Sequence, residues 1–341
     1  MLVLWIHRRD VVSNAFSSVL TVFINELSLH DKRFLQLSNV SHADVARRKR
    51  TNTLTGCVRI DTLNEHAPRN PPHPVVAVII RLYRFHPITH HLAARSYAKI
   101  AADALQGEQF GSALSLVKAA QRNATSLRER LSPDAWQVIT EMAQRLSLDI
   151  EDDDGVVSAA ELTLQELASF SGLAQENMNR AAGWRFLDMG RRAERAINAT
   201  RFARQFAFDG ADDDDLDILL TLADCQITYR SRYLIAPLLA PVRDLAVLDP
   251  YNPRSTAFQV AALTEHISHL PKLKEGGLIE RPQRLAIAMQ ARLTTAEASS
   301  LDTTTLFALE QDLLTLSDSI GSHYFPHGAA ATRPEKLTGL A

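Results

Sequence analysis

The clearest pattern of apolar and polar positions lies between residues 183 and 207. Apolar side chains recur there at spacings of three and four, which predicts a helix with one buried face made by Phe186, Met189, Ala193, Ile197, Thr200 and Ala203. A charged stripe runs beside it. Asp188 lies four residues before Arg192, and a similar spacing joins Arg191 to Glu194, so opposite charges can meet on the helix surface. Such pairs contribute only about 0–1 kcal/mol when they are exposed.

A second pattern, over residues 216–234, places an arginine where an apolar residue is expected. The stripe positions are Leu216, Leu220, Ala223, Ile227, Arg230 and Leu234. Burying an unpaired charge is costly, so Arg230 must either reach outward or find an acidic partner. We predict a partly buried charge network in which Arg230 meets Glu194 or Asp188.

Six more stripes with the same spacing predict helices, at about 116–131, 133–146, 164–178, 253–270, 282–298 and 304–320. The fold class is therefore all-α, a bundle of about eight helices after residue 105. Asn252 is expected to cap one of these helices, with Pro253 as its first residue. Arg254 would then lie in the first turn, where a cation opposes the helix dipole. It either has an acidic partner, binds an anion, or faces solvent.

Residues 1–105 differ from the rest of the chain. They hold eight of the twelve histidines and a proline-rich linker at 64–74, and whether they fold is open from the sequence. We expect a helical domain over 106–326 and a disordered tail over 327–341. His86, His90 and His91 are spaced like metal ligands on a helix, but no acidic or cysteine ligand accompanies them, so no metal is predicted.

Composition excludes only a few classes of partner and location. Hydrophobic residues make up 46% and charged residues 22% of the chain, an ordinary globular balance. The formal net charge of −2 gives no overall attraction to nucleic acid or to an anionic membrane, and we expect neither as a partner. Two distant cysteines, Cys57 and Cys225, make no disulfide framework, and no run of about 20 apolar residues predicts a membrane span. We expect a cytoplasmic protein.

Several stretches together resemble the bacterial alpha-E domain, a helical family with a Glu-Arg motif. The resemblance rests mainly on residues 183–188 and 190–196, and it extends to 119–131, 227–233, 248–255 and the pair at 324–325. It covers about residues 110–326. The first Glu-Arg motif, which normally opens such a domain, is not found before residue 105. The resemblance implies a companion of circularly permuted ATP-grasp peptide ligases and transglutaminase-like peptidases, and hence a role in forming peptide or amide bonds.

No common catalytic motif accompanies this resemblance. The chain lacks a Gly-x-x-x-x-Gly-Lys loop, a Gly-x-Gly-x-x-Gly turn, a His-Glu-x-x-His helix and a Gly-x-Ser-x-Gly elbow, and no cofactor is predicted. The concentrated chemistry consists of helix-borne charges with one tyrosine: Arg185, Asp188, Arg191, Glu194, Arg195, Tyr229, Arg230, Arg232 and Arg254.

Three interpretations of this set remain open. The charges can lock helices together, or the arginines can bind a carboxylate or phosphate, or Glu194 can act as a general base. The first interpretation, taken together with the family resemblance, leads us to expect a non-catalytic accessory or partner-binding domain. The alternative is an enzyme, or a protein that binds an anion or acidic peptide, using the cluster on the helices at 183–207 and 216–235. The ligand, the identity of the partner and the oligomeric state do not follow from the sequence.

Overall fold

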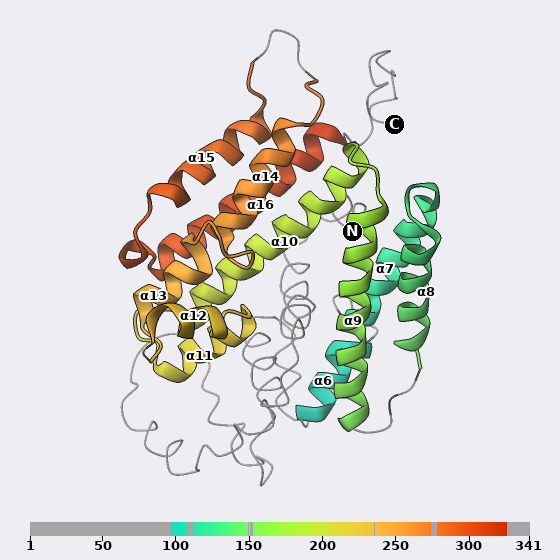
Figure 1. Ribbon diagram of the computed structural model, residues 1–341, viewed down its shortest axis with the longest axis horizontal. Helices are drawn as coiled ribbons and strands as arrows, with labels where there is room; N and C mark the ends of the chain where they lie inside the picture. Colours follow the sequence, from blue (N-terminus) through green and yellow to red (C-terminus); the bar gives the residue numbers. More distant parts are fainter. Residues whose placement is uncertain are drawn as a thin grey trace.

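The structure is a computed structural model that describes residues 97–325 apart from 108–111, 149, 151–152, 235 and 274–277 (Figure 1). Within these ranges the chain forms eleven α-helices and no strand, which confirms the all-α prediction. The expectations for the proline-rich linker, the N-terminal histidines and the tail lie outside the described residues. Among the helices that are described, none combines the length and apolar character that crossing a membrane requires.

The first group of helices packs around its own core (Figure 1). It consists of α6 (Tyr97–Gln106), α7 (Ala113–Ser126), α8 (Pro133–Arg145) and α9 (Asp153–Asn177). α6 contacts α7 and α9, and α8 lies between α7 and α9. The core includes Leu105, Val117, Met142, Leu146 and Leu164, all nearly inaccessible to solvent. α6 thus gives the segment before residue 106 a packed helix, and the helical part of the chain reaches back at least to Tyr97.

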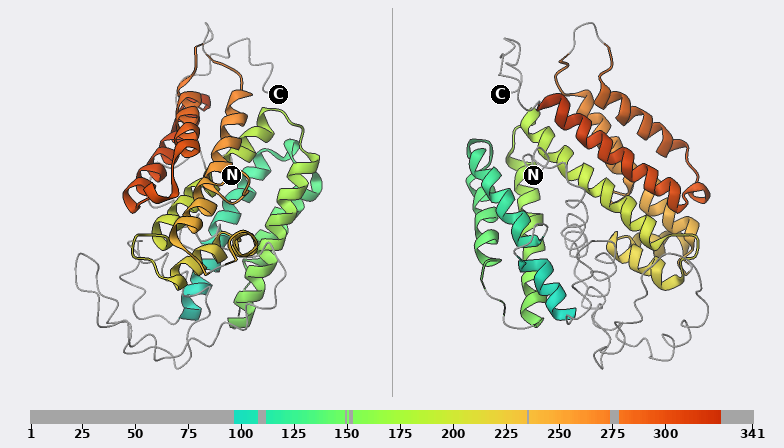
Figure 2. Two further views of the ribbon diagram at one scale, coloured as in Figure 1. Left: turned by 60° about the vertical axis from the view of Figure 1, so that its left-hand side comes forward. Right: turned by 180° about the vertical axis from the view of Figure 1, so that it is seen from behind.

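The second group is larger and is arranged along α10 (Ala182–Phe206) (Figure 2). α10 packs against α14 (Thr256–Ser268) and α16 (Thr303–Tyr324), and α15 (Arg281–Thr295) contacts both of these. The shorter elements α11 (Asp213–Leu222), α12 (Gln226–Tyr233), α13 (Leu239–Arg243) and the π-helical turn η5 (Asp244–Leu248) gather near one end of α10 (Figure 1). The apolar stripe expected on α10 is buried as predicted, at Phe186, Met189, Ala193, Ile197, Thr200 and Ala203.

The prediction for residues 216–234 was wrong in one respect, because the segment is two helices rather than one. α11 ends at Leu222, and Asp224 has a positive φ of 50°, which turns the chain before α12 begins. The spacing of three and four residues that aligned the predicted stripe does not continue across this turn. Ile227 is 73% exposed and Arg230 is also exposed, whereas Tyr229 is buried. The described residues after 105 consequently form ten α-helices, more than the eight expected, with α13 as the other addition.

Helix starts follow the capping signals in some places and not in others. Ser132 caps α8 by accepting from the amide of Ala135 at 3.2 Å, with a proline next in the chain. α14, in contrast, begins at Thr256 and is capped by Ser255, so the expectation that Asn252 caps this helix was wrong. The Asn252 side chain is already engaged with the turn before the helix, as described below.

Candidate functional site

Asp188 is the centre of the polar cluster on α10. Its carboxylate is 4% exposed and accepts hydrogen bonds from three side chains. Arg191 bonds to one oxygen, while Arg192 Nε and His266 Nε2 each lie 2.8 Å from the other. The predicted pairing of Asp188 with Arg192 is therefore confirmed. Because His266 belongs to α14, the same carboxylate also ties two helices together.

The hydrogen bonds of His266 define its tautomer. Arg185 Nη1 lies 3.3 Å from His266 Nδ1, and an arginine can only donate. Nδ1 therefore accepts, and the ring proton resides on Nε2, which donates to Asp188. The ring also packs edge-on against Trp184, with 5.2 Å between the centroids. The neutral imidazole thus links a guanidinium group to a carboxylate.

The α10–α14 contact is polar along much of its length. Arg192 Nη1 donates to Gln259 Oε1 at 3.2 Å, and the Thr200 hydroxyl lies 3.0 Å from that of Thr256. Gln259, Thr200 and Thr256 are fully buried. Buried polar groups are tolerated when they are hydrogen-bonded, and these bonds fix how the two helices face each other.

The electrostatic consequence is strongest for Asp188. Burial alone raises the pKa of its carboxyl. The hydrogen bond from His266 and the charges of Arg191 and Arg192 outweigh that effect, so the pKa of Asp188 lies well below its usual range. The group is ionised at neutral pH, and both of its oxygens accept hydrogen bonds.

Arg195, about two turns beyond Asp188 along α10, is in the opposite situation. It is partly buried, and no hydrogen bond or ion pair joins its guanidinium group to an acceptor anywhere in the described ranges. Burial and the neighbouring charges of Arg191, Arg254 and Arg192 lower the pKa of Arg195 to about 10. The side chain remains a cation at neutral pH, surrounded by other cations.

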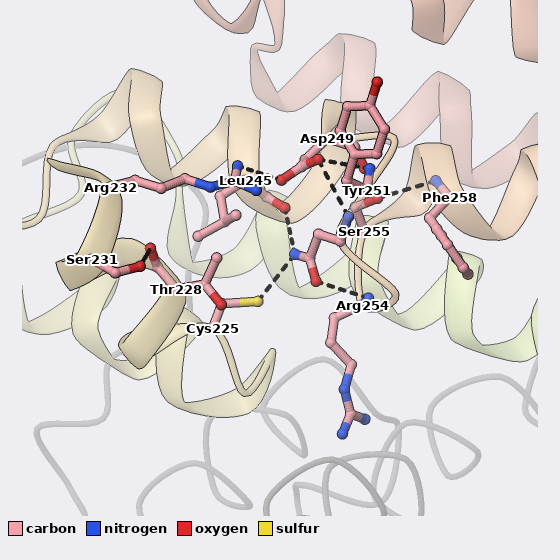
Figure 3. A network of polar contacts seen from close by, with 11 residues as sticks. Cys225, Thr228, Ser231, Arg232, Leu245, Asp249, Tyr251, Arg254, Ser255 and Phe258 are labelled. Atoms are coloured by element: carbon pink, nitrogen blue, oxygen red, sulfur yellow. Dashed lines mark hydrogen bonds and ion pairs between the residues drawn. The ribbon is translucent and has the colours of Figure 1, made fainter.

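Arg254 reaches this cluster from the turn before α14. Its Nη2 donates to Asp224 Oδ2 at 3.0 Å, which is the acidic partner that the sequence analysis left as one option. Its position in a first helical turn was wrong, because the helix begins two residues later. Figure 3 shows the Arg254 side chain pointing away from the rest of the turn.

The turn itself is held by a second polar network (Figure 3). Asp249 accepts from the amides of Tyr251 and Asn252 and pairs with Arg232 Nη1 at 2.5 Å. Asn252 Nδ2 donates to the Leu245 carbonyl at 2.8 Å, and its Oδ1 accepts from the Arg254 amide at 3.0 Å. These bonds explain why Asn252 does not cap α14, and they fix the backbone that carries Arg254.

The remaining predicted residues divide between structural and exposed positions. The Tyr229 hydroxyl is a buried bridge, donating to the Ala236 carbonyl and accepting from the Leu238 amide at 2.9 Å. Glu194 is partly buried on α10 and has an interacting partner of its own. Arg230 is exposed, so its predicted place in a buried network with Glu194 or Asp188 was wrong. The turn at Asp224 rotates α12 and carries Arg230 outward.

Sequence reasoning missed a second buried carboxylate, Glu310 of α16. Its Oε1 lies 2.8 Å from Arg201, and its Oε2 lies 2.9 Å from Arg204, both on α10. A signal was available, because Glu310 follows Leu306 and Leu309 within the apolar stripe of its helix. No spacing rule, however, connects it with residues more than a hundred positions away. No spacing rule connects His266 with Asp188 either, because 78 residues separate them.

The described residues contain no cluster of three or more histidine, cysteine, aspartate or glutamate side chains arranged to hold a metal ion. Cys225 is buried, and burial raises the pKa of its thiol to about 11. The chemistry of the cluster is consequently that of arginines and carboxylates, suited to holding helices together or to binding an anion.

Comparison with known proteins finds relatives of unassigned function. Three mycobacterial relatives, two from strains of Mycobacterium tuberculosis and one from Mycobacterium bovis, are each called an uncharacterized protein. Each is 25% identical over 217 residues, which covers 60% of this chain and 24% of the relative. The chain therefore matches only about a quarter of the length of these relatives. No solved structure matches it significantly.

The family comparison is more extensive. The model of the alpha-E family, described as a predicted alpha-helical domain with a conserved ER motif, matches residues 51–325. The match begins earlier than the motifs that suggested the resemblance. It includes the whole of α10, whose Glu194 and Arg195 form a Glu-Arg pair beside the Asp188 cluster. The chain belongs to the alpha-E family.

Proposed function

We propose that this alpha-E chain is a non-catalytic helical module that assists a peptide- or amide-bond-forming partner, a circularly permuted ATP-grasp ligase or a transglutaminase-like protein. One observation carries the non-catalytic part. Asp188, the acid at the centre of the polar cluster, accepts three hydrogen bonds and joins α10 to α14. The kind of partner comes from the family resemblance.

A catalytic role for this acid has little chemical support. A general base needs a pKa near the working pH and a lone pair that can reach the substrate. The pKa of Asp188 lies well below its usual range, because its charge is stabilised by His266, Arg191 and Arg192 despite the burial that acts to raise it. The Cys225 thiol is buried with a raised pKa, which is unfavourable for a nucleophile.

The exposed side of α12 is a suitable surface for the partner. Ile227 is 73% exposed and Leu234 is 86% exposed, with the exposed Arg230 between them at helical spacing. Leu234 also has a left-handed backbone, with φ of 53°, which costs a non-glycine residue roughly 1–2 kcal/mol. Exposed apolar side chains that gather on one surface can mark a binding site, and a strained residue such as Leu234 is often found at one. Arg230 favours a partner segment that combines apolar and acidic side chains.

The relatives support a modular role. Their match to this chain takes up 24% of their length, so a similar domain occurs there within a much longer protein. A domain that works beside another chain in one protein can be part of the same chain in another.

The test is co-expression with an ATP-grasp protein encoded in the same genome. We expect the two proteins to co-purify, and we expect amide-bond formation to require the ATP-grasp chain. Ile227→Asp combined with Leu234→Asp should abolish co-purification. Leu278→Asp, at a position that is 71% exposed outside α12, is the matched control and should leave co-purification intact.

Two results would contradict the proposal. ATP-dependent amide-bond formation by this chain alone would make it an enzyme. Absence of co-purification with both ATP-grasp and transglutaminase-like proteins would remove the accessory role.

A further inference from the structure

The arginines near Asp188 differ in whether they have an acceptor. Arg191 and Arg192 bond to Asp188, and Arg254 bonds to Asp224. Arg195 lies among these three groups and has no acceptor within the described part of the chain. A partly buried guanidinium group with five N–H donors and no acceptor is unfavourable unless something else binds it.

The Arg195 guanidinium group is not sealed from solvent. Buried side-chain nitrogen or oxygen atoms without a hydrogen-bond partner occur only at Trp136 Nε1 and Gln205 Oε1 in the described ranges. The Arg195 side chain has intermediate exposure, so solvent reaches part of it.

The charge of the cluster indicates what kind of anion fits. The cluster has five arginines, Arg185, Arg191, Arg192, Arg195 and Arg254, and three acids, Asp188, Asp224 and Glu194, so its formal net charge is about +2. A phosphoryl group carries about −1.5 to −2 at neutral pH, whereas a single carboxylate carries only one negative charge. The geometry points to a binding site for the phosphoryl group of a small molecule, with Arg195 as its principal ligand and Arg191 and Arg254 beside it.

The surrounding structure prepares these arginines for binding. Arg191 is fixed by Asp188, and Arg254 is fixed by Asp224 and by the hydrogen-bonded turn from which it projects. Side chains already held in place lose little conformational freedom on binding. The planar guanidinium fork matches the oxygen geometry of a phosphate, and partial burial strengthens the attraction.

The principal ligand, Arg195, lies on α10 and not on α12, and the test of this site needs only the purified chain. Thermal unfolding would be followed in sodium phosphate and in sodium chloride at the same ionic strength. We expect phosphate at about five times its Kd to raise Tm by about 2–4 °C relative to chloride. Two further ligands would be tested in the same way: ATP, which carries phosphoryl groups in a nucleotide, and glutarate, which is a dicarboxylate.

Two arginine variants locate the effect. Arg195→Gln should abolish the phosphate-dependent shift. Arg230→Gln removes an exposed arginine outside the cluster and should retain it. If Arg195→Gln does not fold, Arg195→Lys keeps the charge but loses the fork, and should weaken phosphate binding about tenfold by calorimetry.

The other possible results either overturn the proposed phosphoryl site or support it. No shift with either phosphate or ATP overturns the proposal, and so does a shift that persists in Arg195→Gln. An equal shift with glutarate shows a carboxylate site and overturns the phosphoryl assignment. A shift with ATP alone supports the site and identifies a nucleotide as the source of the phosphoryl group.

Discussion

Two buried carboxylates lie against α10, and they differ in what surrounds them. Asp188 and Glu310 are each 4% exposed, and each is bonded to two arginines of α10. Glu310 reaches α10 from α16, so its arginine pairs are themselves the link between the two helices. Asp188 lies on α10 itself and connects to α14 through His266.

The difference shows how one kind of side-chain pairing can serve two purposes. At Glu310, Arg201 and Arg204 both bond directly to the carboxylate, and the group acts as a lock between helices. At Asp188, the nearby Arg195 remains without an acceptor in the described residues, so positive charge is left over. The first arrangement contributes to the fold, and the second can also bind a ligand.

The largest expected effect comes from breaking the lock. Glu310→Ala should lower the free energy of unfolding by about 3–5 kcal/mol, because Arg201 is then left buried without this carboxylate. Urea denaturation monitored by circular dichroism measures the change. Phosphate should stabilise this variant only as much as it stabilises the unmodified chain, since the site proposed near Arg195 is elsewhere on the helix.

The control is the exposed pair formed by Arg292 and Asp312, whose side chains are 47% and 51% exposed. Asp312→Ala should change the free energy of unfolding by less than about 1 kcal/mol. If Glu310→Ala and Asp312→Ala lowered the free energy of unfolding equally, burial of the Glu310 ion pairs would contribute nothing to stability. Glu310 would then not act as a lock between α10 and α16.

Asp188→Asn is the matching change on the other side of α10. We expect a loss of about 2–3 kcal/mol, because the asparagine amide fits three donors less well than a carboxylate and leaves more positive charge unbalanced. Here phosphate should restore part of the stability, by more than it stabilises the unmodified chain. Urea midpoints in phosphate and in chloride test this, and an equal phosphate response in Asp188→Asn and Glu310→Ala would remove the distinction between the two carboxylates.

The pH dependence separates Asp188 in another way. Its pKa is lower in the folded chain than in the unfolded chain, so the ionised carboxylate favours folding. That contribution is complete above the unfolded pKa of about 4 and is lost as the pH falls towards the folded value. Between pH 5 and pH 3 the unmodified chain should lose about 1–2 kcal/mol more stability than Asp188→Asn. Parallel stability curves for the two proteins would contradict this.

The fold was largely predictable because helix formation depends on local spacing. The stripe on α10 and the helix expected at 133–146 both depend on residues within a few positions of each other, and the structure confirms the buried stripe and the helix α8. The pairing of Asp188 with Arg192 is of the same kind, four residues apart on one helix. Local rules of this sort need no knowledge of the tertiary structure.

The errors arose where a turn or a distant residue decides the outcome. The positive φ at Asp224 ends one helical register and begins another, and Arg230 moves from an expected core position to the surface. His266 and Glu310 join the α10 network across 78 and 109 residues, respectively. Their roles depend on which helices pack together, and a single sequence does not specify this.

Removing the charge of Arg195 is expected to raise the free energy of unfolding, whereas removing the charge of Asp188 or Glu310 is expected to lower it. Arg195→Met keeps most of the apolar length of the side chain and removes a cation from a cluster of cations. Without phosphate, we expect an increase of about 1 kcal/mol in the free energy of unfolding, since burial and like charges already disfavour this guanidinium group and lower its pKa to about 10. A loss of stability instead would mean that Arg195 is part of the structural lock. Urea denaturation in chloride distinguishes the two.

The smallest effect is expected at Arg230. The sequence pattern predicted a core position, and a buried arginine paired with Glu194 or Asp188 would cost several kcal/mol to truncate. The structure places Arg230 on the exposed side of α12, so Arg230→Ala should change the free energy of unfolding by less than about 0.5 kcal/mol. If the loss were as large as that of Asp188→Asn, the chain turn at Asp224 would have to be absent in solution, and α11 and α12 would form the single helix that the spacing alone predicts. The same variant should still respond to phosphate, because Arg195 is unchanged.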